Sequence, residues 1–362
     1  MNPIYEPYIG KKLFPAISIT IPISLNYPEI INDEEKLISI LNDVGYRLRK
    51  LLGNGKADLI MKQITDLKAH IPVLQTAKTL IIYLSPYFSK IIPLPYRLSE
   101  KIIVDDTFEI RDLVYSSQKN QNYFLLMINA NGIKTMIGNN IQYLGVKIPD
   151  MPGNIHDVYN EHSFPGVRYT DKMAFKEKNM HKYVQLVDKI IEDEIVNLTD
   201  FPIIIMGNTE IISDFKLHTH YNNRIIGFVE GSFEHSNTVE IKKAVTNALN
   251  KNEKEKQEKA IELLEKENDQ QHIELGLQNV WRAAAEGKGR ILLVETDYRA
   301  FAIFGEDEYS ILPVMENYDS NEIIQDAVDD IIENILKFDG EVIFIDNGKL
   351  SNYDRIALIT RY

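Results

Sequence analysis

Tyr123-Phe-Leu-Leu-Met-Ile-Asn129 and Ile133-Lys-Thr-Met-Ile137 decide the fold, because they flank the pair Asn131-Gly132. Both runs are rich in the apolar and aromatic residues that strands favour. An Asn-Gly pair tolerates positive φ, which is typical of the turn of a β-hairpin. The stretch therefore predicts two strands joined by a hairpin turn.

The residues after this hairpin predict an α/β arrangement. A loop rich in Pro, Gly and Asn covers residues 149–166, and apolar residues then recur at helical spacing as far as Ile195. Phe201-Pro-Ile-Ile-Ile-Met-Gly207 follows as a buried strand. The order hairpin, loop, long helix and buried strand is typical of α/β domains. We expect the helix to pack on the strand 203–206 through Val184, Val187 and Ile191.

The regions on either side predict two further domains. Before residue 105, strands are expected near residues 14–23, 79–85, 91–95 and 101–104, with helices starting after Asn32 and at Ala57. After residue 245, a charged helix over residues 251–270 precedes helices at 280–285 and 323–338 and strands at 290–295, 341–346 and 355–360. The sequence thus predicts a mixed α/β (α+β) protein of three domains, 1–104, 105–245 and 246–362.

Composition limits the classes of protein that the chain can belong to. It has 362 residues, a net charge of −13 and no cysteine, which excludes disulfides and Cys-based metal sites. The net charge argues against a protein that coats nucleic acid generally, so RNA contacts must come from local basic groups. No apolar run approaches the length of a membrane span, and the start lacks the pattern of a signal peptide. We expect a cytoplasmic protein without a membrane partner.

Three regions resemble one family. Leu277-Gln-Asn-Val-Trp-Arg-Ala-Ala-Ala-Glu-Gly-Lys-Gly-Arg-Ile-Leu-Leu-Val-Glu295 and the ending from Phe338 resemble the last domain of class-1 release factors and Pelota. Tyr123 to Gly138, with the loop and helix that follow, resembles their central RNase H-like domain. Residues 79–95, with Phe108-Glu-Ile-Arg-Asp-Leu113, are similar to the bacterial archaeo-eukaryotic-type release factors. The resemblance is weak before residue 79.

This resemblance implies a ribosome-bound factor whose domains are arranged like a tRNA, with the central loop towards the peptidyl-transferase centre. It also implies contacts with rRNA and ribosomal proteins, and it makes a translational GTPase such as elongation factor Tu a candidate second partner. Class-1 release factors release peptides with a Gly-Gly-Gln tripeptide on the central loop. This sequence contains no Gly-Gly pair anywhere, and the corresponding loop reads Glu161-His-Ser-Phe-Pro-Gly-Val-Arg-Tyr169.

The missing tripeptide predicts that the chain does not release peptides. Without paired glycines the backbone cannot readily adopt the same conformation, and no Gln side chain positions water. Residues 1–104 also lack an Asn-Ile-Lys-Ser stretch, so stop-codon recognition is not expected. The Balon group of hibernation factors, in the same family, lacks the tripeptide too. We therefore predict no enzymatic activity, no catalytic residue and no cofactor, and a factor of the hibernation or rescue type that occupies a tRNA site.

Two basic groups and one loop are the predicted ribosome- and RNA-binding residues. An aromatic side chain next to arginine can stack on unpaired bases, and lysines can neutralise phosphates. The loop contributes Ser163, Phe164, Pro165, Gly166, Arg168 and Tyr169, the start of the long helix Lys172, Lys176, Lys178, His181 and Lys182, and the first helix Arg47, Arg49 and Lys50. The alternative is a solvated helix face or, for the first helix, cations that favour the helix dipole.

Other patterns leave alternatives open. His218-Thr-His220 could place two imidazoles on one side of a strand, but no spacing specifies a third ligand, and Tyr221-Asn-Asn next favours a polar loop, so no metal site is predicted. Gly287-Lys-Gly289 lacks the rest of a phosphate loop and indicates a turn. A metal-dependent hydrolase or nuclease acting on RNA or peptidyl-tRNA would need three or more acids converging in one cleft. A non-ribosomal interaction module of a stress or conflict system is the third alternative.

Overall fold

The computed structural model describes residues 4–23, 29–52, 54–68, 77–139, 142–158, 169–233, 236–268, 271–315 and 323–362. Its contacts divide the chain into two compact units. The central unit is Asn120–Lys256, and the terminal unit combines Met1–Lys119 with Gln257–Tyr362. Within the described ranges, no helix is long and apolar enough to cross a membrane.

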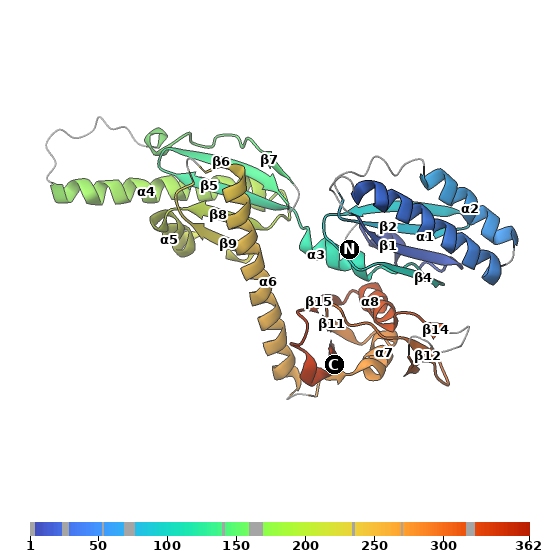
Figure 1. The fold of residues 1–362 in the computed structure, drawn as a ribbon. Helices are drawn as coiled ribbons and strands as arrows, with labels where there is room; N and C mark the ends of the chain where they lie inside the picture. The colour runs from blue at the N-terminus through green and yellow to red at the C-terminus, as the bar shows by residue number, and fades with distance from the viewer. Residues whose placement is uncertain are drawn as a thin grey trace. The chain divides into compact units, whose positions relative to one another are not determined.

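The central unit is built on a sheet of five strands in the order β7-β6-β5-β8-β9 (Figure 1). The strands are β5 (Tyr123–Asn129), β6 (Gly132–Gly138), β7 (Tyr143–Gly145), β8 (Ile203–Gly207) and β9 (Ile225–Glu230). The first three are antiparallel, whereas β8 and β9 run parallel to β5. This is the RNase H-like arrangement that the resemblance implies for the central domain. The predicted hairpin is also confirmed, because Asn129 pairs with Gly132.

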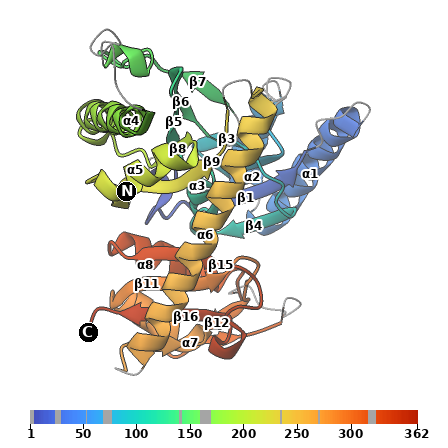
Figure 2. The same cartoon turned by 90° about the vertical axis from the view of Figure 1, so that its left-hand side faces the viewer.

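Helices cover both faces of this sheet (Figure 2). On one face lie α4 (Tyr169–Ile191), which continues into a π-helical turn over Glu192–Val196, and α5 (Thr209–His218). The first part of α6 (Thr238–Asn268) covers the other face with Ile241 and Val245. Val184, Val187 and Ile191 of α4 share a buried core with Ile203 and Ile205 of β8, so the predicted packing is confirmed.

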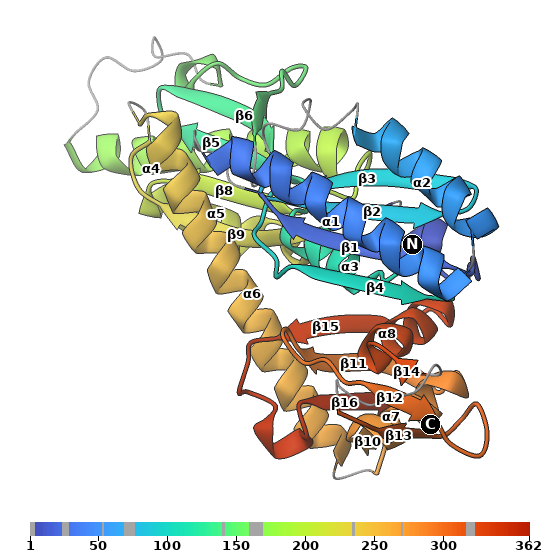
Figure 3. The same ribbon diagram turned by 45° about the vertical axis from the view of Figure 1, so that its right-hand side comes forward.

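The first part of the terminal unit is a four-stranded sheet in the order β3-β2-β1-β4 with two helices on it (Figure 3). The elements are β1 (Ala16–Pro22), α1 (Glu29–Leu52), α2 (Asn54–Lys68), β2 (Thr79–Ser85), β3 (Phe88–Leu94) and β4 (Lys101–Asp105). Because successive side chains of β1 and β2 point to opposite sides of the sheet, both faces of the sheet carry apolar side chains. One packs on Leu41, Val44 and Leu48 of α1.

The last part of the terminal unit holds a four-stranded sheet, β10-β16-β11-β15, and a smaller one, β13-β12-β14. The elements are β10 (Ile273–Leu275), α7 (Leu277–Ala285), β11 (Gly289–Glu295), β12 (Ala302–Phe304), β13 (Ile311–Pro313), β14 (Ile323–Ile324), α8 (Ala327–Lys337), β15 (Glu341–Ile345) and β16 (Ile356–Thr360). Helix α8 begins four residues later than expected from the sequence, because Asp326 is its cap and accepts a hydrogen bond from Val328 N at 3.2 Å.

One buried core joins the two parts of the terminal unit. Tyr83 of β2 and Phe108 share it with Ile331 of α8 and Leu113 of α3 (Arg111–Lys119). Helix α3 lies in the segment between β4 and β5. The described chain is thus a mixed α/β protein with several sheets, as predicted. The three-domain boundaries near residues 105 and 245 stay a prediction.

Candidate functional site

Helix α4 turns one face to the sheet and another to solvent. Met180, Val184 and Val187 are buried because they recur at the spacing of one helix turn and pack against β5 and β8. Lys178 and Lys182 lie on the exposed face. A separation of four residues makes them neighbours on the helix surface. The structure therefore brings two of the predicted RNA-contact lysines together and leaves both accessible.

Most other predicted contact residues lie outside the described part of the chain. This holds for the loop residues Ser163, Phe164, Pro165, Gly166 and Arg168. It also holds for the side chains of Tyr169, Lys172, Lys176, Arg47 and Lys50, whose backbone belongs to helices α4 and α1. Their role in ribosome binding stays a prediction.

Arg49 is the member of the first basic group whose side chain is described. Its guanidinium Nη2 lies 3.4 Å from Asp58 Oδ1 of α2, and both side chains are more than half exposed. An exposed pair of this kind contributes about 0–1 kcal/mol. The pair gives Arg49 a weak structural contact between α1 and α2, and its role in RNA binding stays a prediction.

His181 does not point to solvent like its lysine neighbours but contacts helix α5. Its Nδ1 lies 2.7 Å from Asp214 Oδ1, and His218 Nδ1 lies 3.0 Å from the same oxygen. The two imidazole rings meet edge to face, with centroids 4.5 Å apart. Gln185 Nε2 lies 2.8 Å from the other ring nitrogen of His181. Two imidazoles and one carboxylate thus converge between α4 and α5.

Only His220 lies in the polar loop that the sequence favours for His218 and His220. His218 is the last residue of helix α5 and not part of a strand, and His220 lies exposed beyond the helix end. Because side chains four residues apart share a helix face, His218 meets Asp214 instead of His220. Sequence reasoning missed Asp214. The Asn208 cap, whose Oδ1 accepts from Ile211 N at 2.9 Å, is the signal that would have placed α5 here.

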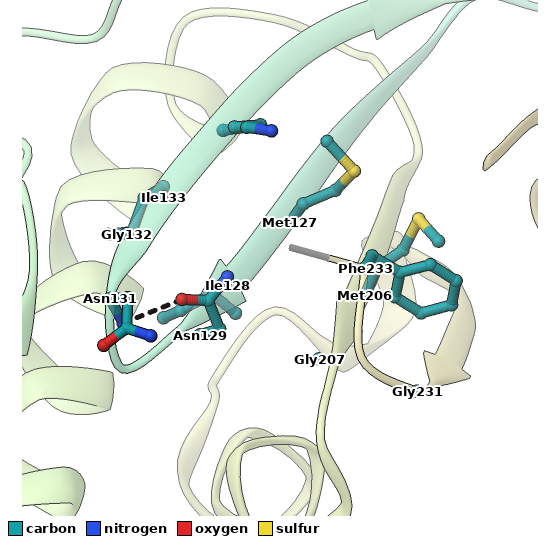
Figure 4. Close-up of a pocket in the computed structure, with 11 residues that line it drawn as sticks. Met127, Ile128, Asn129, Asn131, Gly132, Ile133, Met206, Gly207, Gly231 and Phe233 are labelled. Atoms are coloured by element: carbon teal, nitrogen blue, oxygen red, sulfur yellow. Dashed lines mark hydrogen bonds between the residues drawn. The ribbon is translucent and has the colours of Figure 1, made fainter. Parts of the chain in front are cut away.

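A hollow of about 250 Å³ lies at the carboxyl ends of β5 and β8 (Figure 4). This edge of a parallel pair is where α/β folds commonly bind ligands. Met127, Met206 and Phe233 give it apolar walls, and Asn129 and Lys134 supply polar groups. Among the described residues that line the hollow, none is acidic. The hollow therefore offers no described pair of carboxylates for acid–base or metal chemistry.

A group of buried charges lies where α3 begins in the terminal unit. Lys101 Nζ contacts Glu109 and lies 2.8 Å from Asp112 Oδ2. Burial raises the pKa of Glu109 to about 7, although the ammonium of Lys101 opposes the shift. Burial also acts on Asp112, but Lys101 and the nearby arginines outweigh it and hold the pKa of that carboxyl below its usual value. One ammonium between two carboxylates therefore leaves Glu109 as the group that keeps a proton.

Arg111 and Asp329 complete this buried group. The guanidinium of Arg111 donates to the carbonyls of Glu295 at 3.2 Å and Thr296 at 2.8 Å. Asp329 Oδ1 accepts from the backbone N of Ile110 at 3.0 Å and of Arg111 at 2.6 Å, so a carboxyl of α8 caps α3. Burial, together with the charge of Glu109, raises the pKa of Asp329 well above its usual range. The contacts join distant parts of one unit and indicate a structural role.

Residues 122–288 match the model of bacterial archaeo-eukaryotic release factor family 3. Over these residues the chain is similar to bacterial archaeo-eukaryotic release factors. The matched residues include β5 to β9, α4 and α5, and therefore the exposed lysines and the histidine cluster. No curated protein matches the chain.

Several solved structures of translation factors are similar to the chain at low identity. The archaeal translation termination factor aRF1 is 12% identical over 97% of this chain and 94% of that chain, with a TM-score of 0.22. Archaeal Pelota, in a model of its ribosome-bound form with ABCE1, is 13% identical over 78% of each chain, with a TM-score of 0.42. S. cerevisiae Dom34, a translation termination-like factor that interacts with Hbs1, is 11% identical over 78% of this chain and 79% of that chain, with a TM-score of 0.38.

Proposed function

We propose that the chain binds the ribosome and occupies a tRNA site without releasing peptide. The observation that supports this proposal is the match of residues 122–288 to a release factor family in a sequence that has no Gly-Gly pair. The similarity to this family favours the ribosome as the partner, whereas the missing tripeptide removes the group that class-1 release factors use for hydrolysis. In this proposal the chain is cytoplasmic and acts by filling a tRNA site of the ribosome, as a hibernation or rescue factor does.

The contact surface of this proposal is the exposed face of α4 and the connection before it. Lys178 and Lys182 are accessible and one helix turn apart, so both can reach phosphates of one RNA backbone. Phe164 and Arg168 of the connection are the proposed partners for unpaired bases. Because the net charge of the whole chain is −13, attraction to RNA must come from such a local group. A translational GTPase such as elongation factor Tu is the second partner that we propose.

Co-sedimentation of the full chain with bacterial ribosomes at several salt concentrations tests this surface. The double variant Lys178→Glu, Lys182→Glu is expected to lose at least about 10-fold in affinity and to show a weaker salt dependence, since fewer counterions are released. The matched control is Lys242→Glu, Lys243→Glu, which makes the same charge change at exposed positions of α6. An equal loss in both variants would mean that net charge, and not the α4 face, determines binding.

A peptide-release assay on terminated ribosome complexes tests the second half of the proposal. The wild-type chain is expected to release no more peptide than buffer alone, because no side chain replaces the Gln that positions water. A release factor with an intact Gly-Gly-Gln serves as the positive control. Release at a rate comparable to that control would contradict the proposal even if the chain binds ribosomes.

A further inference from the structure

The side chains of His181, Asp214 and His218 form a cluster of donor atoms that ribosome binding does not explain. One ligand atom from each of the three lies within 4.8 Å of the others. Asp214 Oδ1 lies 2.7 Å from Nδ1 of His181 and 3.0 Å from Nδ1 of His218, which also lies 3.0 Å from the backbone carbonyl oxygen of Asp214. Asp214 and His218 are four residues apart on α5, a spacing that places two ligands on one helix face. The third donor comes from α4 across the contact between the helices.

We propose that His181, Asp214 and His218 bind one divalent transition-metal ion of the Zn²⁺ type. Imidazole nitrogen and carboxylate oxygen are ligands that Zn²⁺ accepts at about 2.0–2.2 Å. In a tetrahedral site such bonds place neighbouring ligand atoms about 3.3 Å apart. The two nitrogen–oxygen separations, 2.7 and 3.0 Å, are about 0.6 and 0.3 Å shorter than this, and all three ligand atoms lie within 4.8 Å of one another. Small rotations of the exposed imidazole of His218 and of the Asp214 carboxylate open the space that the ion needs.

Gln185 is placed to orient His181 as a ligand. A zinc-bound imidazole commonly donates the N–H of its other nitrogen to an acceptor, which fixes the tautomer of the ring. Gln185 offers that acceptor, because its amide group lies 2.8 Å from His181 Nε2. The amide atom of Gln185 that lies next to this nitrogen is Nε2. With the ion on Nδ1, a flip of the amide presents Oε1 to the proton on Nε2.

The site is open on one side. The Asp214 side chain is 16% exposed, while those of His181 and His218 are 35% and 46% exposed. The carboxylate therefore lies at the base and the two imidazoles at the rim. Three protein ligands leave a fourth position of a tetrahedral ion for water or for a group from outside the chain. The bound ion would hold α4 against α5 within the matched residues 122–288.

Metal binding to the tag-free full chain tests this inference independently of the ribosome. After removal of metal with a chelator, titration with Zn²⁺ and with Co²⁺, as a spectroscopic probe, is expected to show one strong site per chain. Gln185→Ala should weaken binding by about 10-fold to 100-fold, the range for an outer partner of a ligand. His181→Ala and His218→Ala should weaken it further. His220→Ala, an exposed histidine two residues from the site, should leave the affinity unchanged.

A conservative variant keeps the test valid if an alanine variant does not fold. Asp214→Asn retains an oxygen that accepts hydrogen bonds from the imidazoles but removes the charge that an ion needs, and circular dichroism checks the fold. Loss of the strong site in Asp214→Asn with the native spectrum supports the proposal. The absence of a strong site in the wild-type chain, undiminished binding in Asp214→Asn and His181→Ala, or an equal loss in His220→Ala would each overturn it.

Discussion

Glu109 illustrates how burial sets the charge of a single residue. Its side chain is 3% exposed, it shares Lys101 with Asp112, and its Oε2 has no partner among the described atoms. An unpaired buried carboxylate oxygen costs free energy when ionised, so the proton stays on at a higher pH than in water. This residue makes the stability of the terminal unit depend on pH.

We predict that the chain loses stability as the pH rises from about 5 to about 7. The folded pKa of Glu109 is about 7, against a reference value of 4.5, so the folded chain holds the proton more tightly across this window. Stability falls with pH where the folded state binds more protons, and we expect a loss of about 1–3 kcal/mol. Urea unfolding at several pH values measures it. Glu109→Gln should flatten the profile, whereas the exposed control Glu308→Gln should keep it; a wild-type profile in Glu109→Gln would refute the assignment.

Asp329 makes a second prediction at the same scale. Its Oδ1 accepts two backbone N–H groups at the start of α3, and its pKa is raised well above the usual range by burial and by nearby acids. Asp329→Asn keeps this acceptor without a charge and should cost less than about 1 kcal/mol. Asp329→Ala leaves two buried donors without a partner and should cost about 2–3 kcal/mol of unfolding free energy. Equal stability of the two variants in urea unfolding would show that the cap contributes nothing.

At the scale of elements, the packing of α4 on β8 should govern the stability of the central unit. Val187 is fully buried between them, while its neighbour Leu186 is 38% exposed. Val187→Ala opens a cavity and should lower the unfolding free energy by about 2 kcal/mol. Leu186→Ala removes a larger side chain but should cost less than about 1 kcal/mol. Thermal and urea unfolding check the pair, and a larger loss for Leu186→Ala would mean that the face assignment of α4 is wrong.

Elements with a local signal could be predicted from the sequence, and elements without one could not. The hairpin at Asn131-Gly132 and the core strand β8 follow from turn chemistry and apolar runs. Strands of two or three residues, such as β7 and β14, are too short to show a period. Helix α8 was extended too far because Ile323 and Ile324 fit its apolar pattern. Their place is in a separate strand, β14, which pairs with β12.

The candidate site was predictable only in part, because only some of its residues belong to a local sequence pattern. Exposed lysines on α4 follow from helical periodicity, because their neighbours Met180, Val184 and Val187 are apolar. The contact of His181 with Asp214 joins residues 33 positions apart on two helices, and no local pattern specifies such a pair. The sequence places His218 next to His220, whereas in the structure His218 lies next to Asp214.

At the scale of the whole molecule, the largest surprise is that the first 119 and the last 106 residues form one compact unit. Arg111 belongs to a helix near the start of the chain yet donates to carbonyls 184 and 185 positions away. Sequence patterns report which face of an element is apolar but not which distant element covers it. The family resemblance implied separate domains, and the buried charges around Arg111 were not singled out. The α/β arrangement of the central unit, by contrast, follows from its own order of elements.

If the chain occupies a tRNA site on the ribosome, it competes with tRNA for that site, and a displacement experiment measures this competition. Labelled tRNA is bound to vacant ribosomes, and the full chain is added at increasing concentrations while the bound tRNA is measured. We predict that one chain per ribosome displaces tRNA from one site. The double variant Lys178→Glu, Lys182→Glu should need a higher concentration for the same displacement of tRNA. Simultaneous binding of the chain and a full complement of tRNA, or no binding of the chain to ribosomes, would contradict the account.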